Sequence, residues 1–139
     1  MSEMKTVFSK DAAPPAGPYI TANDPPPETQ SHAIATPSAI YCSGQIPCRA
    51  DGTILTLSDS SIGDMTELCI QNLAAVLQAA GSELTKVVKV NVFLTSMDNF
   101  VEMNKVYEKF FTHKPARSCV AVYQLPKGVP VEIECIALP

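Results

Sequence analysis

The hydrophobic pattern changes its period several times between Ile62 and Ala137, and this succession constrains the fold more than any other feature. Apolar residues recur at steps of three and four in two segments, and they alternate with other residues in three more. The first spacing is typical of an amphipathic helix, and alternation is typical of a strand. The chain is therefore predicted to combine two helices with a sheet.

The first predicted helix begins at about Ile62 and stops at Gly81, which accepts a left-handed conformation. Its apolar stripe consists of Ile62, Met65, Cys69, Leu73, Val76 and Ala80. The second helix is expected to follow a cap at Ser96 or Asp98 and to end before Pro115. Its apolar positions are Phe100, Met103, Tyr107 and Phe110.

Strands are predicted before, between and after the helices. A central strand places Val88, Val90, Val92 and Leu94 on one apolar face. Residues 118–123 and 131–137 are expected to form two later strands, 6–9 an edge strand, and 33–35 with 39–43 a hairpin. This order predicts an α+β domain with both helices on one face of a mixed sheet. The other face also carries apolar residues and is expected to need a partner subunit.

Proline crowds the first third of the chain. Eight of the 12 prolines stand at or before Pro47. Proline lacks the backbone donor that helices and central strands require, so the stretch from Pro14 to about Pro37 is predicted to be irregular.

Length and charge exclude several classes of protein. The 139 residues suit one domain, and no apolar run is long enough to span a bilayer. A net charge of −4 disfavours a nucleic-acid partner. Five cysteines without a CxxC pair make a disulfide framework or a zinc site unexpected.

With no apolar signal segment at the start and no arginine before Arg49, the cytoplasm is the expected compartment and mitochondria the alternative.

No GxG, P-loop or HExxH motif is present, so the common motifs for nucleotides and for catalytic zinc are absent from the sequence. A catalytic triad would have to recruit His32 or His113. We interpret both instead as solvent-facing or helix-capping histidines.

Arg117 is the strongest candidate for binding an anion, because it stands where Pro115 ends a helix and a strand begins. A guanidinium held there can bind a carboxylate through two parallel hydrogen bonds. An internal ion pair is the open alternative. The other arginine, Arg49, is interpreted as a solvated turn residue.

Glu132 and Glu134 project from the same face of the last predicted strand. Neighbouring carboxylates repel, so one is expected to be paired and the other kept as a proton acceptor. A solvated outer face is the open alternative. Asn104 places an amide beside the apolar face of the second helix, where the simpler interpretation is a boundary amide that satisfies backbone groups.

Several motifs in this order resemble the signature of the Rid family, the YjgF group of reactive-intermediate deaminases, also described as L-PSP endoribonucleases. A weaker match is AGPY at 16–19. The motifs are YCSGQIP at 41–47, NL at 72–73, AAGS at 79–82, VVKV at 87–90, VFL at 92–94, NKVY at 104–107, PARSCV at 115–120, LPKG at 125–128 and VEIE at 131–134.

The resemblance implies a chorismate-mutase-like fold and a homotrimer with ligand clefts between subunits. It implies a hydrolase, a 2-iminobutanoate/2-iminopropanoate deaminase. Its substrates would be 2-enamine or 2-imine acids such as 2-aminoacrylate and 2-aminocrotonate, released by pyridoxal-phosphate-dependent dehydratases. The products are 2-oxo acids and ammonia, and no metal or cofactor is required. Alternative functions are an endoribonuclease or translation inhibitor, and a non-catalytic module that binds small carboxylates.

Site roles follow from the resemblance. Arg117 would clamp the substrate carboxylate, and Glu132 would deprotonate the attacking water. The remaining expected binding residues are Tyr19, Ser43, Gly44, Asn104 and Cys119, the last through its backbone carbonyl, with a side chain that serves as a small hydrophobe. The chain departs from the family pattern by a proline-rich insertion at about 21–31, which follows Tyr19 within a single domain spanning 1–139.

Overall fold

A computed structural model of the protein describes residues 3–14 and 30–139. Within them, six strands form one sheet in the order β1-β2-β3-β6-β4-β5. All neighbouring strands are antiparallel except β4 and β5, so the sheet is mixed. The strands are β1 (Lys5–Val7), β2 (Ala33–Ala35), β3 (Ile40–Gln45), β4 (Val87–Leu94), β5 (Ala116–Ala121) and β6 (Val131–Ala137).

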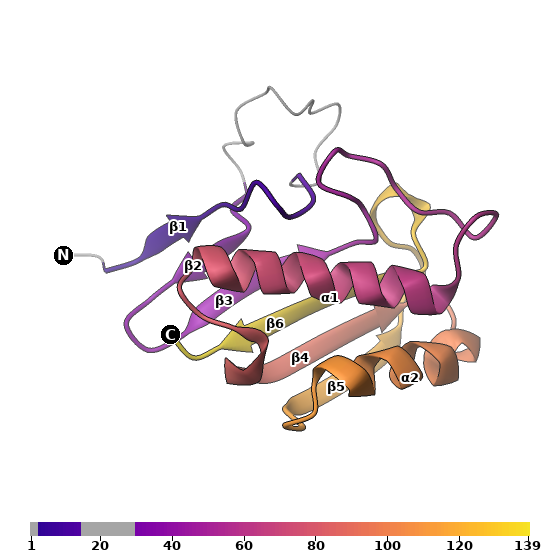
Figure 1. Ribbon diagram of the computed structural model, residues 1–139. Helices are drawn as coiled ribbons and strands as arrows, with labels where there is room; N and C mark the ends of the chain where they lie inside the picture. The colour runs from indigo at the N-terminus through magenta and orange to yellow at the C-terminus, as the bar shows by residue number, and fades with distance from the viewer. Residues whose placement is uncertain (1–2, 15–29) are drawn as a thin grey trace.

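Two α-helices, α1 (Ile62–Ala79) and α2 (Phe100–Phe110), lie on the same face of the sheet (Figure 1). Short 3₁₀ helices lie between the larger elements: η1 (Leu84–Lys86), η2 (Met97–Asn99) and η3 (Pro126–Gly128). The predicted α+β architecture is confirmed. No helix in the described parts of the chain has the length and apolar character of a membrane span.

Helix α1 is closed at both ends by local chemistry. Ser61 Oγ accepts a hydrogen bond from the Asp64 N–H at 3.0 Å, and the Asp64 carboxylate accepts one from the Ser61 N–H at 3.2 Å. This reciprocal capping box satisfies two donors that the first turn leaves free. Beyond the helix, Gly81 has a φ of +81°, which glycine adopts without a Cβ penalty. The predicted stop at Gly81 is confirmed.

Helix α2 continues from the 3₁₀ turn before it. Ser96 Oγ accepts a hydrogen bond from the Asp98 N–H at 3.2 Å and so caps η2. Ser96, rather than Asp98, is therefore the capping residue of this helical segment. After α2 the chain enters β5 at Ala116, two residues earlier than predicted.

The main core lies between the helices and the sheet. The stripe predicted for α1 supplies Met65, Cys69, Leu73 and Val76, all with 0% exposure. Facing them are the inward side chains of the central strands. These are Val90, Val92 and Leu94 of β4 and Val131, Ile133 and Cys135 of β6.

Strand β4 departs from its predicted pattern at Val88. This side chain was expected on the apolar face, yet it is 43% exposed, whereas Val87 is 2% exposed. The register with β6 shifts between Val87 and Lys89, as at a β-bulge. Because a slip of one residue exchanges the two faces of a strand, Val87 takes the core position. The prediction for Val88 was wrong.

Leu73→Ala is expected to lower the free energy of unfolding by about 2–5 kcal/mol, because it removes buried methyl groups and leaves a cavity beneath α1. Urea denaturation followed by circular dichroism measures the change. Leu57→Ala is the matched control: Leu57 is 63% exposed, and a surface truncation of this kind costs less than about 0.5 kcal/mol. Equal losses in the two variants would contradict the assigned core.

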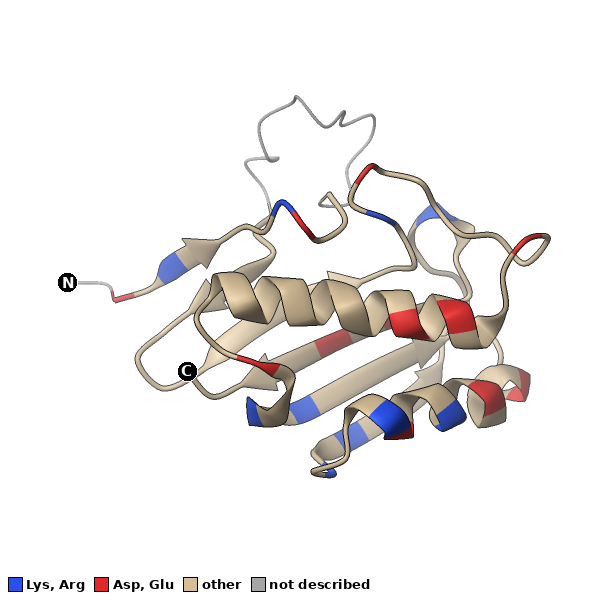
Figure 2. Cartoon of the chain, viewed as in Figure 1, with Lys and Arg blue, Asp and Glu red and all other residues tan. Residues whose placement is uncertain are grey.

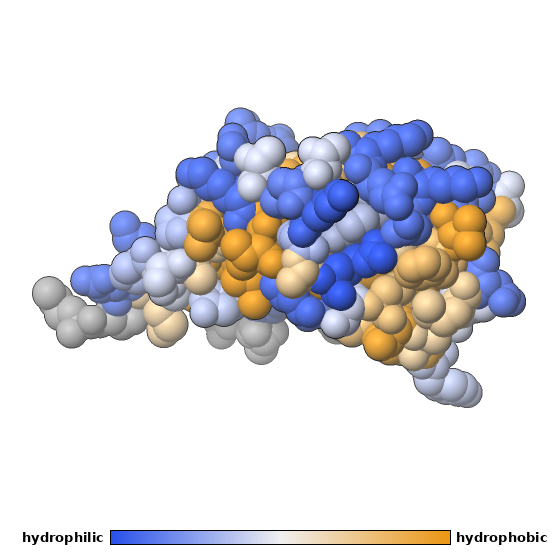
Figure 3. All heavy atoms as spheres, turned by 90° about the horizontal axis from the view of Figure 1, so that it is seen from below, coloured by the Kyte–Doolittle hydropathy of each residue, from blue (hydrophilic) through white to orange (hydrophobic). Residues whose placement is uncertain are grey.

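No described helix packs on the second face of the sheet. Tyr41, Val88 and Val120 are exposed there, beside the half-buried carboxylates of Glu132 and Glu134. Seen from below, from the side where β5 and α2 lie in Figure 1, the surface shows apolar patches separated by hydrophilic groups (Figure 3). Exposed apolar groups in such patches are compatible with a subunit interface. The expected homotrimer remains a prediction.

Candidate functional site

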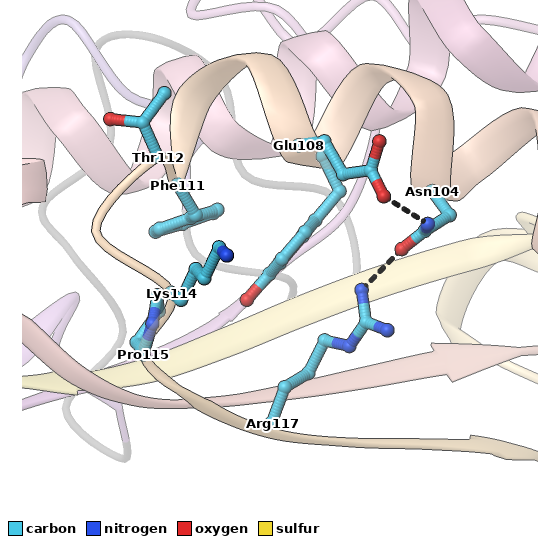
Figure 4. A pocket seen from close by; sticks show the side chains of 8 residues that line it. Asn104, Glu108, Phe111, Thr112, Lys114, Pro115 and Arg117 are labelled. Carbon is cyan, nitrogen blue, oxygen red and sulfur yellow. Dashed lines mark hydrogen bonds between the residues drawn. The ribbon is translucent and has the colours of Figure 1, made fainter.

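Arg117 lies on the helix side of the sheet. It pairs in register with Val90, a fully buried core residue, so its side chain rises from β5 towards α2. Arg117 Nη1 donates a 2.5 Å hydrogen bond to Asn104 Oδ1, and Asn104 Nδ2 donates one of 2.9 Å to Glu108 Oε1 (Figure 4). The amide of Asn104 is thus oriented by Glu108, one helical turn further on. Asn104 was expected among the binding residues, and its contact with Arg117 is compatible with that expectation.

Two aromatic rings of α2 also hold the guanidinium. Arg117 Cζ lies 4.6 Å from the ring centroid of Tyr107 and 5.5 Å from that of Phe100. A cation over an aromatic face is attracted by the ring quadrupole. Arg117 forms no ion pair with any carboxylate of the described residues, and its Nη2 and Nε groups have no hydrogen-bond partner among them. The internal ion pair considered for Arg117 is therefore not observed within residues 3–14 and 30–139.

The guanidinium borders a hollow of about 630 Å³. Figure 4 shows its labelled side chains, which come from α2, the following turn and β5. The lining residues are Asn104, Tyr107, Glu108, Phe111, Thr112, Lys114, Pro115 and Arg117. A cation with free donors at the edge of such a hollow can bind a small carboxylate.

Cys119 stands two residues after Arg117 and shares its face of β5. Its side chain is half-buried and packs against the main core, and burial raises the pKa of the thiol. The thiol is thus suited to packing rather than to nucleophilic attack.

The peptide groups of Cys119 have a different environment from its thiol. Val122 N–H donates to Leu94 O of β4, and peptide groups of successive strand residues point alternately to the two sides. Those of Cys119 therefore point away from β4. Because β5 ends the sheet, they face the open edge.

Glu132 lies on the opposite face of the sheet from Arg117. Its partner in register is Phe93, whereas the core residues Val131 and Ile133 flank it on the other face. Burial, and secondarily the charge of Glu134, raise the pKa of the Glu132 carboxyl. A carboxylate with a raised pKa is a stronger base than an ordinary one.

The two neighbouring carboxylates differ in their partners. Asn91 Nδ2 donates a 3.0 Å hydrogen bond to Glu134 Oε1, while no described residue donates a hydrogen bond to Glu132. In the part of the chain that the structure describes, one carboxylate is thus held by an amide and the other accepts no hydrogen bond. Both are half-buried, so the fully solvated face considered for them is not observed.

Gly44 packs directly against Glu132. A Cβ at Gly44 would overlap Glu132 Oε1 and lie 2.9 Å from Cδ. Both residues border a second hollow, of about 240 Å³. Its lining residues are Ala13, Pro14, Gln30, His32, Gly44, Gln45, Ile46, Pro126 and Glu132.

Gly44→Ala is expected to displace the Glu132 carboxylate, because the new methyl group would occupy its position. The carboxylate is the end of a flexible side chain and can move, so the free energy of unfolding is expected to fall by about 1–3 kcal/mol at most. Any activity that depends on Glu132 is expected to fall by about tenfold or more. Thermal unfolding and turnover measured on the same sample separate the two effects. Unchanged activity would contradict a role for the Gly44–Glu132 contact.

Two further binding residues were expected, Ser43 and Tyr19, and only Ser43 lies within the described residues. Ser43 Oγ donates a 2.7 Å hydrogen bond to Ser31 O, and Ser43 lines neither hollow. Tyr19 and most of the expected insertion at 21–31 lie outside the described residues. Thus one group contains Arg117, Asn104 and Cys119, and a second contains Glu132 and Gly44.

The interpretation was wrong for His32, which is buried, whereas His113 is exposed as expected. His32 is 4% exposed, and its ring hydrogen-bonds to backbone groups of the N-terminal segment. His113 Nε2 lies 2.8 Å from Val87 O of β4, so it links a loop to the sheet rather than capping α2. Short spacing patterns reveal neither contact, because both partners are distant in the sequence.

Two contributors to the Arg117 environment were also missed. Tyr107 was assigned only to the core, and Glu108 was not considered as a partner of Asn104. The i, i+4 spacing of Asn104 and Glu108 on a helix was the available signal.

In the described parts of the chain, no group of three or more His, Cys, Asp or Glu residues is arranged to hold a metal ion.

The chain matches a family model and several known proteins over most of its length. The family model Endoribonuclease L-PSP matches residues 21–139. The protein mmf1, mitochondrial, of Schizosaccharomyces pombe is 46% identical over 138 residues, which cover 96% of this chain and 76% of the relative. The crystal structure of yeast Mmf1 superposes with a TM-score of 0.85 at 39% identity, covering 97% of this chain and 98% of that one.

A third relative is TdcF of Escherichia coli, which is named a candidate reactive intermediate deaminase. It is 36% identical over 141 residues, covering 97% of this chain and 98% of TdcF. A crystal structure of TdcF with bound serine superposes with a TM-score of 0.81 and covers 97% of this chain and 98% of that one. The family match and these relatives together show that the chain belongs to the Rid/YjgF family, also described as endoribonuclease L-PSP.

Proposed function

We propose that the protein hydrolyses reactive 2-enamine and 2-imine acids, such as 2-aminoacrylate and 2-aminocrotonate, to 2-oxo acids and ammonia. The observation that carries the proposal is an arginine that is fixed by Asn104 and Tyr107 at a hollow, while its Nη2 and Nε donors have no partner among the described residues. Family membership and the name of the relative TdcF support the same reaction class.

A complete site requires two copies of the chain. Arg117 and Glu132 lie on opposite faces of the sheet, and β4 separates their strands, so they are about 10 Å apart along the sheet alone. The open edge of β5 and the uncovered face that carries Glu132 can instead meet between subunits. We therefore assign the cleft to the interface of a homotrimer, with Arg117 and Glu132 contributed by different copies.

The proposed reaction begins with the substrate carboxylate on the free donors of Arg117. The Cys119 carbonyl accepts a hydrogen bond from the substrate nitrogen, which orients the C=N bond. Glu132 takes a proton from a water molecule as its oxygen attacks the imine carbon. The protonated Glu132 returns that proton to nitrogen, which gives a carbinolamine. Glu132 then takes the proton of the carbinolamine hydroxyl and passes it to the amine as the C=O bond forms, so the C–N bond breaks and ammonia leaves the 2-oxo acid. In this scheme Ser43, Gly44 and Tyr19 shape the cleft.

Imines of this kind are released by pyridoxal-phosphate-dependent dehydratases, which are the proposed functional partners. The proposed compartment is the cytoplasm, with mitochondria as the alternative. The names of the relatives mmf1 and MMF1 include the word mitochondrial and support the alternative.

A trapping assay tests the proposal. Threonine dehydratase generates the imine, semicarbazide competes for it, and 2-oxobutyrate release is followed. The protein is expected to increase keto-acid release at the expense of the trapped product. Equal yields with and without the protein would contradict the proposal.

The family description makes endoribonuclease activity the second candidate. Charge does not favour it: Lys and Arg are interspersed with Asp and Glu in the view of Figure 2. RNA binding normally uses a basic surface with aromatic platforms. RNA cleavage abolished by both Arg117→Ala and Glu132→Gln would support this candidate, and cleavage that survives them would place it outside the site. Binding of 2-oxobutyrate without any turnover would instead support a carboxylate-binding module.

A further inference from the structure

Both ring nitrogens of the buried His32 are used to hold one short loop. Nδ1 accepts a hydrogen bond from the Ser9 N–H at 3.0 Å, and Nε2 lies 2.7 Å from the carbonyl oxygen of Ala13. Since a carbonyl only accepts, Nε2 must carry the proton, and Nδ1 must be bare to accept from Ser9. The contacts thus require the neutral ring and one tautomer. They brace loop 9–13 at its two ends.

This loop forms one wall of the hollow around Glu132. Ala13 and Pro14 line that hollow together with His32, Gly44 and Glu132. Ala13 is 3% exposed and packs in a small apolar cluster, separate from the main core. The other buried members of that cluster are Ile46, Cys48 and Val129. The position of the wall therefore depends on a few apolar contacts and on the two hydrogen bonds of His32.

We propose that His32 is a positioning residue for Glu132: its neutral imidazole holds loop 9–13 against the hollow, and protonation of the ring in acid releases that wall. The functional part of this inference rests on the proposed role of Glu132 as the base. The structural part, a wall fastened by one titratable ring, stands without it.

Protonation is incompatible with the observed contacts. With a proton on Nδ1, two donors would face each other at the Ser9 contact, and a charge would be left in a buried site. Burial lowers the pKa of His32 below its ordinary value, and the bond to Ala13 opposes this less strongly. Since the unfolded chain takes up the proton first, at pH about 6.5, the stability contributed by this residue falls as pH decreases below that value.

Few charged groups of the described residues surround the ring. Glu132 of β6 lines the same hollow, and Lys127 belongs to the neighbouring η3. The braced loop itself carries the exposed Lys10 and Asp11. Strands β2 and β3 carry no Asp, Glu, Lys or Arg, and their only titratable side chains are Tyr41 and Cys42 of β3. Glu132 also titrates in acid, so a pH profile of activity alone would not separate the two groups.

His32→Gln supplies the matched control. A glutamine amide has an oxygen that can accept from the Ser9 N–H and an NH₂ that can donate to the Ala13 carbonyl, but it does not titrate. Amide hydrogen exchange of Ser9, measured by NMR and corrected for the intrinsic pH dependence, reports the bond directly. In the wild type, protection of this amide is expected at pH 7 and should be lost as the pH falls through the titration of His32. In His32→Gln it should be independent of pH.

A second measurement links the loop to Glu132 without using activity. The pKa of Glu132, followed by ¹³C NMR of its carboxyl, is expected to fall towards the ordinary value in His32→Ala, because water enters where the wall was. His32→Gln should keep the wild-type pKa. An unchanged Glu132 pKa in His32→Ala would overturn the positioning role. An unprotected Ser9 amide at pH 7, or the same pH response in His32→Gln as in the wild type, would overturn the brace. Neither readout requires turnover, so failure of the proposed deaminase activity would be recognised separately in the trapping assay.

Discussion

Arg117→Ala is expected to lower the rate of imine hydrolysis by about 100-fold, because the substrate loses the group that aligns it for attack. A charge-assisted bidentate bond contributes about 1.5–3 kcal/mol, and each 1.4 kcal/mol corresponds to about tenfold in binding. Misalignment of the imine carbon adds to that loss. The fold should persist, since the guanidinium is half-buried and forms no ion pair with the described residues.

Arg49→Ala is the matched control for this loss. Arg49 is the only other arginine in the chain, and it lies exposed in a turn. The variant removes the same charge and should keep wild-type activity. Arg117→Lys keeps the charge but not the two-pronged geometry, so only part of the activity should return. Equal activity in Arg117→Ala and Arg49→Ala would show that the charge of Arg117 does not bind the substrate.

Glu132→Gln is expected to reduce kcat by about 10²–10⁴-fold, because an amide cannot accept the proton from water. The Michaelis constant should change little, since Arg117 still binds the carboxylate. Burial and Glu134 raise the pKa of Glu132, so the folded protein binds the proton more tightly than the unfolded chain. The stability contributed by this carboxyl is therefore present in acid, and it falls as the pH rises from the ordinary pKa of a glutamate through the higher pKa of folded Glu132. Glu132→Gln should accordingly raise the melting temperature at pH 7 while it lowers activity.

Glu134→Gln provides the comparison on the same strand and face. Glu134 is already engaged by Asn91, and a glutamine oxygen can accept the same hydrogen bond. Activity should stay within a few-fold of the wild type, with Glu132 titrating at lower pH once its neighbour is neutral. A loss as large as that of Glu132→Gln would mean that the wrong carboxylate has been assigned as the base.

The helices could be predicted because their information is local. The spacing from Ile62 to Ala80 determines a stripe within one element, and Gly81 marks its end. Both features appear unchanged in the structure. Val88 shows the limit of this reasoning: alternation continues through Val88 in the sequence, but a bulge against β6 reverses the faces at that point. A bulge depends on the partner strand, which the pattern of one strand does not contain.

The relative placement of Arg117 and Glu132 could not be predicted for the same reason. Alternation shows which residues of one strand share a face, but it gives no common reference for two strands. Only the registers of β4 with β5 and with β6 show that the two side chains point to opposite faces. His32 illustrates a different gap, because its partners Ser9 and Ala13 are about twenty residues away and belong to a segment without regular structure.

In the proposed trimer, Arg117 of one copy and Glu132 of another form each cleft, and subunit mixing tests this arrangement most directly. Arg117→Ala and Glu132→Gln are each prepared alone, then dissociated together and reassembled in equal amounts. In a closed trimer with random mixing, about one quarter of the clefts receive an intact arginine and an intact glutamate. The trapping assay should then show about a quarter of wild-type activity, although each variant treated alone stays inactive. Mixtures that remain inactive, while wild-type protein recovers after the same treatment, would contradict the shared cleft.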